Sequence, residues 1–278
     1  MARVDFIPLG SKIRKDNVSL IAQIKSVSKQ NVFLSDDLIK DTFKASQKYL
    51  NTIYGEPEAA TLSVEIIEYT KQFDSANTFY KYITRESMEK YYKKGYFRLG
   101  TLLDYQNAKV ENIKDRREGH THLVLESKER QLLQSFYGGF NYLVFCGSYI
   151  PPDDPRSDYL KKKFGSCVMK VSNIQTFKKA IQKHLNICRS HYRQVDYHKI
   201  KAFKKTIDFD LDEDMNEIFP DKTFKEINNI TSEVSIFYKR DSYSPEHEMR
   251  FAFEMPCDQK HPKDLHNKGL LDYVEFIE

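Results

Sequence analysis

The chain has 278 residues and a formal net charge of +4, from 44 Lys and Arg against 40 Asp and Glu. Hydrophobic residues make up 40% and charged residues 30%, an ordinary globular composition that argues against disorder. The net charge is too small to require a nucleic-acid partner, and no stretch reaches the roughly 20 apolar residues that a membrane span needs. Because Met1–Gly10 lacks the long apolar run of a signal peptide, the sequence predicts a cytoplasmic protein.

The aromatic composition is uneven, since the chain has 19 Phe and 18 Tyr but no Trp. A tyrosine can stack on a planar ligand and still hydrogen-bond through its hydroxyl, although most of these rings are expected to fill the core. The four cysteines form no Cys-x-x-Cys pair, which favours reduced thiols. Lysines gather within 90–94, 161–163 and 201–205, where they could meet a phosphate-rich partner or form ordinary solvated surface.

The first 77 residues are predicted to be helical. The predicted helices are Val18–Ser28 and Asp36–Tyr54, the second with Ser35 as its N-cap and Gly55 as its stop. We therefore expect a helical N-terminal annex over residues 1–77 and a main domain over residues 78–278.

The main domain opens with a strand, a helix and a second strand. Phe79–Ile83 is a short aromatic run typical of a strand, and Thr84 can cap a helix that extends to Lys94. Gly95 suits the left-handed closing position, after which Tyr96–Leu102 is predicted to be a strand.

The remaining pattern predicts a sheet with segregated helices. Residues 103–140 are polar and expected to be rich in loops. A helix capped by Ser172 is expected to run to about Tyr192. Four further strands are predicted, at Asn141–Ile150, Gly165–Val171, Glu233–Lys239 and Glu246–Met255. The predicted fold class is α+β, with a mixed, largely antiparallel sheet.

The last of these strands carries the sharpest chemical signal. A period of two places Glu246, Glu248 and Arg250 on one face, with His247 and Met249 on the other. Two neighbouring carboxylates repel each other, and Arg250 could compensate their charge. The alternative is that this face is the solvent-exposed side of a sheet that is covered on its other face only.

Five short motifs follow one another between residues 78 and 255. They are Tyr80-Lys81-Tyr82, Gly95-Tyr-Phe-Arg98-Leu-Gly100-Thr101, Asp115-Arg-Arg-Glu118-Gly119, Cys146-Gly-Ser148 and Glu246-His-Glu248-Met-Arg250. Their order resembles that of the ADP-ribosyltransferase superfamily, whose R-S-E branch carries Arg, Ser and Glu-x-Glu on successive strands. The chain resembles more closely a large bacterial family with distant transferase-like features.

The resemblance implies a sheet core of the ADP-ribosyltransferase type and cleavage of NAD, used as a substrate, without a metal. It gives Glu248 the role of stabilising the ribose cation, Glu246 that of orienting or deprotonating the acceptor, and Ser148 that of holding the glutamate or a ribose hydroxyl. The cofactor-binding residues that it implies are Lys81 at a phosphate or ribose oxygen, a stacking Tyr80, Tyr82 or Tyr105, and the flanking Arg98 and Arg250.

The resemblance also implies a biological context. Some members of the wider superfamily are toxins of toxin–antitoxin and phage-defence systems that modify protein, DNA or RNA. We therefore expect a nucleic-acid or protein acceptor, with a neutralising antitoxin as a candidate partner of residues 1–77. The open alternatives are a non-catalytic nucleotide- or peptide-binding module with a degenerate transferase fold, and an RNA nuclease that uses Lys81, His247 and Glu248.

Other chemical signals are weaker. His184, Cys188 and His191 would share one face of the long predicted helix, but no fourth zinc ligand is evident beyond His198. The alternating aspartates of residues 208–214 lack the glycine of a calcium loop. Cys146 could be a nucleophile, although no local base accompanies it. No Walker A or Gly-x-Gly-x-x-Gly motif is present.

Overall fold

The computed structural model describes residues 3–15, 18–27, 35–54, 64–69, 78–108, 114–115, 117–128, 130–198, 201–208, 230, 233–257 and 259–278. The chain divides into two compact units, each built from separate stretches of sequence. The first contains Met1–Lys71, Gly119–Gly139 and His198–Arg240, and the second contains Gln72–Glu118, Phe140–Tyr197 and Asp241–Glu278. None of the helices formed by the described residues is long and apolar enough to cross a membrane.

The first unit is built on a six-stranded sheet with the order β1-β2-β7-β6-β12-β3. The pairs β1–β2, β2–β7 and β7–β6 are antiparallel, whereas β12 runs parallel to both β6 and β3. These strands are β1 (Arg3–Lys15), β2 (Val18–Val27), β3 (Glu65–Glu68), β6 (His120–Glu126), β7 (Arg130–Tyr137) and β12 (Lys201–Thr206). The short strand β13 (Tyr238–Arg240) also belongs to this unit, whereas the short strand β11 (Asp196–His198) begins in the second.

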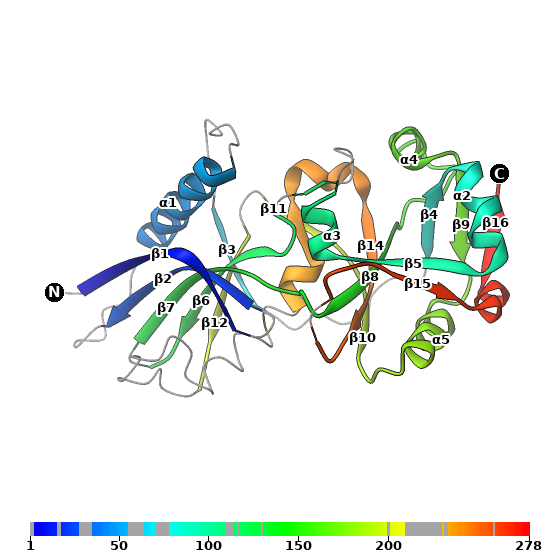
Figure 1. The fold of residues 1–278 in the computed structure, drawn as a ribbon. Helices are drawn as coiled ribbons and strands as arrows, with labels where there is room; N and C mark the ends of the chain where they lie inside the picture. Colours follow the sequence, from blue (N-terminus) through cyan, green and yellow to red (C-terminus); the bar gives the residue numbers. More distant parts are fainter. Residues whose placement is uncertain are drawn as a thin grey trace. The chain divides into compact units, whose positions relative to one another are not determined.

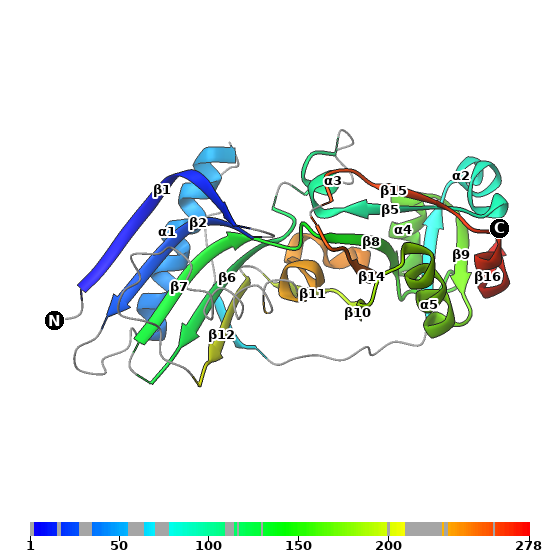
Figure 2. The ribbon, with the colours of Figure 1, turned by 60° about the horizontal axis from the view of Figure 1, so that its bottom comes forward.

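The helix α1 (Asp36–Tyr54) lies across one face of this sheet (Figures 1 and 2). Its residues Ile39 and Phe43, one turn apart, pack against Val124 and Leu133 of the sheet. The helix begins and ends as the sequence predicts. The predicted helix over 18–28 is wrong, because these residues form β2, whose apolar residues alternate as a strand requires. The first unit is therefore not a helical annex.

The second unit contains an eight-stranded sheet in which every pairing is antiparallel. Its main path runs β10-β14-β8-β4-β9-β16, and β5 joins β8 beside this path with β15 as its own neighbour. The strands are β4 (Phe79–Ile83), β5 (Tyr96–Thr101), β8 (Tyr142–Ser148), β9 (Cys167–Val171), β10 (Ser190–Gln194), β14 (Glu248–Glu254), β15 (Lys263–His266) and β16 (Val274–Ile277). Both units thus mix helices with a largely antiparallel sheet, as the α+β prediction requires.

Helices cover both faces of the second sheet (Figure 1). Phe177 and Ile181 of α5 pack on one face with Phe145 and Phe251, and Leu160 of α4 packs on the other with Tyr82. The helices of this unit are α2 (Arg85–Lys90), α3 (Leu102–Gln106), α4 (Ser157–Phe164) and α5 (Ile174–Leu185), with the short 3-10 turns η1 (Tyr92–Lys94), η2 (Asp241–Glu246) and η3 (Lys268–Tyr273).

The predicted strand–helix–strand unit at the start of this domain is confirmed. The Thr84 side chain accepts a hydrogen bond from the Ser87 amide at 3.1 Å, which caps α2. Gly95 closes η1 with a φ of 82°, in the left-handed region that favours glycine. The amphipathic helix is split, however, because α2 ends at Lys90 and the chain tightens into η1.

Four other sequence expectations need correction. Residues 103–140 contain β6 and β7 rather than loops, because their polar side chains are buried and mask the strand pattern. The helix predicted to start at Ser172 is capped by Asn173 and stops at Leu185, where Asn186 turns left-handed with a φ of 54°. Residues 233–237 are helical rather than extended. The last predicted strand begins at Glu248, two residues late.

Gly165 is the glycine on which the junction of α4 and β9 depends. Its φ of 126° is one that side-chain-bearing residues rarely adopt, and an added Cβ would lie 2.3 Å from the Ile83 carbonyl carbon and oxygen. We expect Gly165→Ala to lower the free energy of unfolding by about 2 kcal/mol or more, measured by urea denaturation. Gly269→Ala is the control, because its Cβ would meet only the Asn267 side chain, at 3.3 Å. Equal stability of the two variants would contradict this account.

Candidate functional site

The strand β8 stands where the second sheet branches. On one edge, Leu143 and Val144 pair with β5, while Ser148 pairs with Tyr80 of β4. On the other edge, β8 pairs with β14 along its whole length, from Tyr142 to Ser148. Residues 145–147 therefore lie between two diverging neighbours, and in the described part of the chain no strand pairs with them on that edge. The predicted Cys146-Gly-Ser148 motif occupies this branch.

A buried charge cluster lies on β14 beside the branch. The Arg250 guanidinium donates from Nε to Glu248 Oε1 at 2.6 Å and from Nη1 to Glu118 Oε1 at 2.7 Å. The side chains of Arg250 and Glu118 are each 1% exposed, and that of Glu248 is 6% exposed. We call these three residues the carboxylate clamp. An arginine suits this arrangement because its planar fork can bind two carboxylates at once.

The loop that carries Glu118 is fixed to α3. The Asp115 amide donates to the Tyr105 carbonyl at 3.1 Å, and the Gln106 side chain donates to the Glu118 carbonyl at 2.5 Å. Within the loop, the Arg117 amide donates to the Asp115 carboxylate at 3.0 Å. The Asp115-Arg-Arg-Glu118-Gly119 motif thus has a structural explanation: it delivers a carboxylate to Arg250. The sequence pattern singled out this motif without assigning Glu118 a partner.

Two side chains fill the branch at Cys146. Lys81 Nζ donates to the Cys146 carbonyl at 2.6 Å and lies 4.6 Å from the centre of the Phe145 ring. The Tyr105 hydroxyl donates to Cys146 Sγ at 3.4 Å, and Gly100 leaves room for it, since an added Cβ would lie 2.7 Å from that hydroxyl. The predicted residues Lys81 and Tyr105 are therefore brought to β8, the strand that pairs with β14 and its Glu248.

Burial controls the protonation of this group. It lowers the pKa of Lys81 from its ordinary value, and the negative charge of Glu248 partly opposes that change. Burial raises the pKa of the Cys146 thiol to about 12, with the Glu248 carboxylate adding to the increase. Burial also raises the pKa of Tyr105 well above its ordinary value. The thiol and the phenol are therefore neutral at physiological pH.

Ser148 lies directly opposite Glu248 in the register of β8 and β14. Its hydroxyl donates to the His247 carbonyl at 3.0 Å and accepts from the Ile150 amide at 3.2 Å. The Glu248 amide instead donates to the Tyr197 hydroxyl at 2.8 Å, a contact that the sequence did not predict. The structure thus places Ser148 beside the glutamate, holding the main chain that leads into it.

The other predicted cofactor-binding residues lie outside the clamp. Tyr80 and Tyr82 are buried in the apolar cluster under α4, and the Tyr82 hydroxyl donates to the Ile150 carbonyl at 2.8 Å. Arg98 has a side chain that is 64% exposed and lies 3.9 Å from Asp264. Their hydrogen bonds and ion pairs given above go to partners other than Glu248 and Arg250.

Glu246 does not share a strand face with Glu248. It ends η2, and His247 then adopts a left-handed φ of 45°, which breaks the alternation that the sequence predicted. The Glu246 carboxylate accepts from Lys163 Nζ of α4 at 2.7 Å, and the two side chains are 8% and 13% exposed. The expected Glu-x-Glu pair is therefore divided between two ion pairs.

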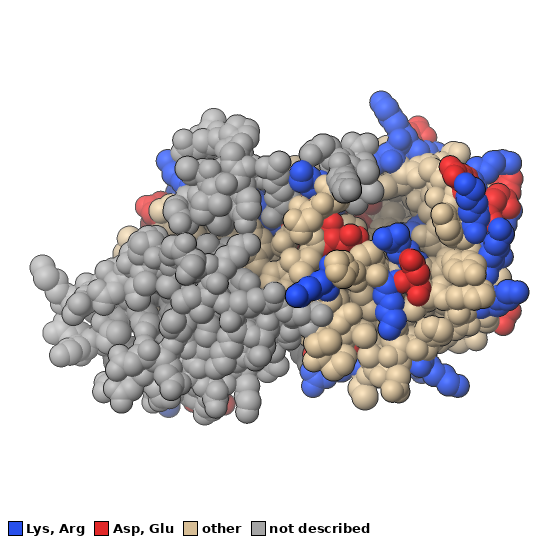
Figure 3. Space-filling model, in the orientation of Figure 1, with Lys and Arg blue, Asp and Glu red and all other residues tan. Residues whose placement is uncertain are grey.

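The lysine clusters are mixed with acidic groups. On α2 and η1, Lys90 lies 2.7 Å from Glu86, and Lys93 lies 2.7 Å from Glu89 and 3.1 Å from Glu278. Figure 3 shows the same mixture of positive and negative side chains over α2, at the right edge of the view. This surface offers no single-sign patch for a polyanion.

Nor do the residues that the structure describes contain any group of three His, Cys, Asp or Glu suited to a metal ion. The zinc constellation of His184, Cys188 and His191 is not formed on one helix, because α5 ends at Leu185 and His191 lies in β10. Residues 210–214 of the aspartate series lie outside the described residues.

Removing the central cation tests the clamp. We expect Arg250→Met to lower the free energy of unfolding by about 3–5 kcal/mol, because two buried carboxylates lose their counterion. Adding Glu118→Gln should recover part of this loss, since one of the stranded charges is removed. Chemical denaturation of the single and double variants measures both effects. The control Arg98→Met breaks an exposed pair and should change stability by less than about 0.5 kcal/mol. Arg250→Met behaving like Arg98→Met would contradict the clamp.

The thiol pKa gives an independent measure of the site. At pH 8 we expect iodoacetamide to modify Cys146 on the order of 1000-fold more slowly than the exposed Cys188, because so little of Cys146 is thiolate. Glu248→Gln should accelerate modification of Cys146, since a negative charge that raises the pKa is removed. Peptide mass spectrometry resolves the two thiols. Rapid modification of Cys146 in the native protein would show that it is an activated nucleophile instead.

Similarity to known proteins gives no further guide to this site. Comparison of the chain with protein-family models, with curated proteins and with solved structures finds no match in any of the three.

Proposed function

We propose that the second unit cleaves NAD between nicotinamide and ribose and transfers the ADP-ribose to an acceptor, either nucleic acid or protein. The observation that carries the proposal is the carboxylate clamp at the branch of the sheet. One glutamate is held in a fixed orientation by a buried arginine, beside a lysine and a tyrosine hydroxyl. The resemblance of the five motifs to transferases supports the same assignment.

Glu248 has the chemistry that this reaction needs. Loss of nicotinamide gives the ribose an oxocarbenium character, as in glycoside hydrolysis, and a nearby carboxylate stabilises the developing positive charge. Arg250 donates hydrogen bonds to both oxygens of the Glu248 carboxylate and restricts its rotation, so little reorganisation is required when the charge appears. Glu118 acts through Arg250, by holding the guanidinium from its other side.

Lys81 and Tyr105 supply the remaining polar groups. A lysine ammonium has three donors, of which the structure uses one for the Cys146 carbonyl. The others could meet a phosphate or ribose oxygen of NAD, and the half-buried Tyr105 ring could stack on nicotinamide. Because Tyr80 and Tyr82 are packed under α4, Tyr105 is the best placed of the three predicted stacking residues. The roles of a toxin or defence enzyme, and of an antitoxin partner, follow from the resemblance alone.

Conversion of the catalytic carboxylate to an amide tests this function. We expect Glu248→Gln to slow nicotinamide release from NAD by about 100- to 1000-fold, because the fixed charge that stabilises the transition state is lost. Glu254→Gln, which changes a partly exposed carboxylate on the same strand, should retain normal activity. Nicotinamide is measured chromatographically, with labelled NAD and cell lysate as the source of acceptor.

Each outcome assigns a class of protein. The transferase is supported if Glu248→Gln loses both label transfer and nicotinamide release while the native protein and Glu254→Gln retain them. Release without transfer in the native protein indicates an NAD hydrolase. Absence of both from the folded native protein contradicts the proposal and favours a non-catalytic binding module.

A further inference from the structure

His247 has an unusual backbone and lies between the two glutamates of the motif. Its φ of 45° is left-handed, a conformation that residues other than glycine seldom adopt. Two hydrogen bonds to its carbonyl hold it there, from Ser148 Oγ at 3.0 Å and from the Tyr149 amide at 3.1 Å. The same end of β8 therefore fixes both His247 and its neighbour Glu248.

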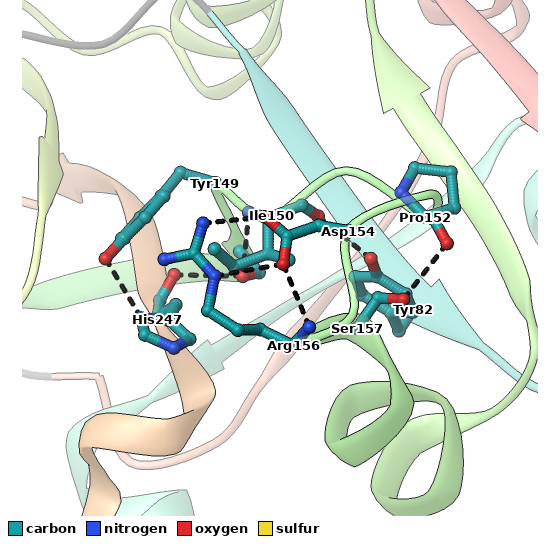
Figure 4. A network of polar contacts seen from close by, with 9 residues as sticks. Tyr82, Tyr149, Ile150, Pro152, Asp154, Arg156, Ser157 and His247 are labelled. Atoms are coloured by element: carbon teal, nitrogen blue, oxygen red, sulfur yellow. Dashed lines mark hydrogen bonds and ion pairs between the residues drawn. The ribbon is translucent and has the colours of Figure 1, made fainter.

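The imidazole ring is oriented through only one of its nitrogens. Nδ1 shares a hydrogen bond of 2.9 Å with the Tyr149 hydroxyl, as Figure 4 shows. Nε2 makes no hydrogen bond or ion pair within the described part of the chain, and the residue is partly exposed. An imidazole bonded through Nδ1 and open at Nε2 has the arrangement of a general base held by an orienting group.

The ring lies on the same face of the sheet as Glu248. Directly opposed residues of antiparallel strands project to the same face, so Glu248, Ser148 and Tyr80 share one. Tyr80 packs with Leu160 of α4, which identifies this as the α4 face. The charged neighbours of His247 come from the turn just before α4 (Figure 4).

Those neighbours are Asp154 and Arg156, which are joined by hydrogen bonds of 2.6 and 3.0 Å. With Tyr149, they are the titratable and charged groups that face the ring in the described residues. Burial lowers the pKa of His247 below its ordinary value of 6.5, the Arg156 cation lowers it further, and the Asp154 carboxylate partly opposes both. The imidazole is therefore neutral and able to accept a proton at physiological pH.

Glu246 is poorly suited to that task. Its carboxylate is buried and bound to the Lys163 ammonium, which lies over the Tyr243 ring at 5.8 Å. On the basis of the proposed function, we propose that His247, oriented by Tyr149, is the residue that accepts the proton of the incoming acceptor group.

The proposed step is balanced without any additional reactant. The bond between the ribose C1′ and the nicotinamide nitrogen breaks, and its electron pair leaves with neutral nicotinamide. A lone pair on the acceptor oxygen or nitrogen forms the new bond to C1′. The proton of that atom passes to Nε2 of His247, and the imidazolium then returns it to water.

The test measures transfer of label from radiolabelled NAD to cell lysate, together with nicotinamide release. Asparagine tolerates the left-handed backbone but cannot accept the proton, so His247→Asn should fold normally. We expect it to slow label transfer by about 100-fold and far more than it slows nicotinamide release. His266→Asn is the matched control, because His266 is an exposed histidine stacked on Tyr96 with ring centres 4.2 Å apart. It should leave both rates unchanged.

The pH profile supplies a second readout that a purely structural role would not move. Transfer by the native protein should rise with pH through a midpoint below 6.5, as His247 loses its proton. Arg156→Met removes a cation and should shift this midpoint upwards by about half a pH unit, whereas Asp154→Asn should shift it downwards.

The outcomes separate this inference from the function on which it rests. Native protein that releases nicotinamide, while His247→Asn transfers label at the native rate, overturns the role of His247 alone. A midpoint that Arg156→Met and Asp154→Asn leave in place does the same. Native protein that releases no nicotinamide overturns both the function and this inference.

Discussion

The second unit depends on burying one arginine between two carboxylates that come from distant parts of the sequence. Removing these charges from water costs several kcal/mol for each ion, and their attraction offsets that cost only if the geometry is good and the remaining hydrogen bonds are made. Arg250 and Glu248 lie on one strand, but Glu118 must be brought in by a loop. The hydrogen bonds that fix this loop to α3 are therefore a requirement of the clamp. Three apolar side chains of similar volume could stabilise the unit as well, so stability alone does not explain why these charges are buried.

The branch of the sheet lies beside this cluster and has its own requirement. A strand carbonyl that lacks a neighbouring strand needs another donor, because an unpaired buried polar group is costly. Lys81 provides that donor to Cys146, and Tyr105 occupies the space above Gly100. Polar side chains thus complete the sheet where a strand would otherwise continue. The side-chain hydrogen bonds that complete the sheet here can be exchanged for hydrogen bonds to a ligand. Hydrogen bonds between continuously paired strands cannot be exchanged in this way.

The sequence predicted those parts of the structure that depend on local signals. Thr84 and Gly95 marked the ends of a helical segment, and the apolar run of β8 was long enough to identify. The sequence also selected four residues that the fold brings together: Glu248, Arg250, Lys81 and Tyr105. It failed where tertiary contacts override the pattern. The strand β6 buries His120, Thr121 and His122, so its polarity concealed it. The alternation of residue types placed Glu246 on the strand β14. It could not show that His247 adopts a left-handed φ, because a single residue of that conformation does not change the alternation. The pairing of Glu118 with Arg250 spans 132 residues and no local rule reveals it.

The two units bury polar groups in different ways, and the difference indicates where chemistry is to be sought. In the first unit, His122 bonds to Ser135 at 2.6 Å and Ser135 bonds to Ser46 at 2.9 Å, which ties α1 to the sheet. Side-chain hydrogen bonds of this kind fix the docking of a helix. In the second unit the buried cluster includes the ion-paired Arg250, Glu248 and Glu118 beside a branch of the sheet. The residue before Glu248 is a histidine whose Nε2 makes no hydrogen bond among the described residues. A charge that the fold holds in a fixed position can stabilise a charge that appears during a reaction, more strongly than an uncharged hydroxyl can.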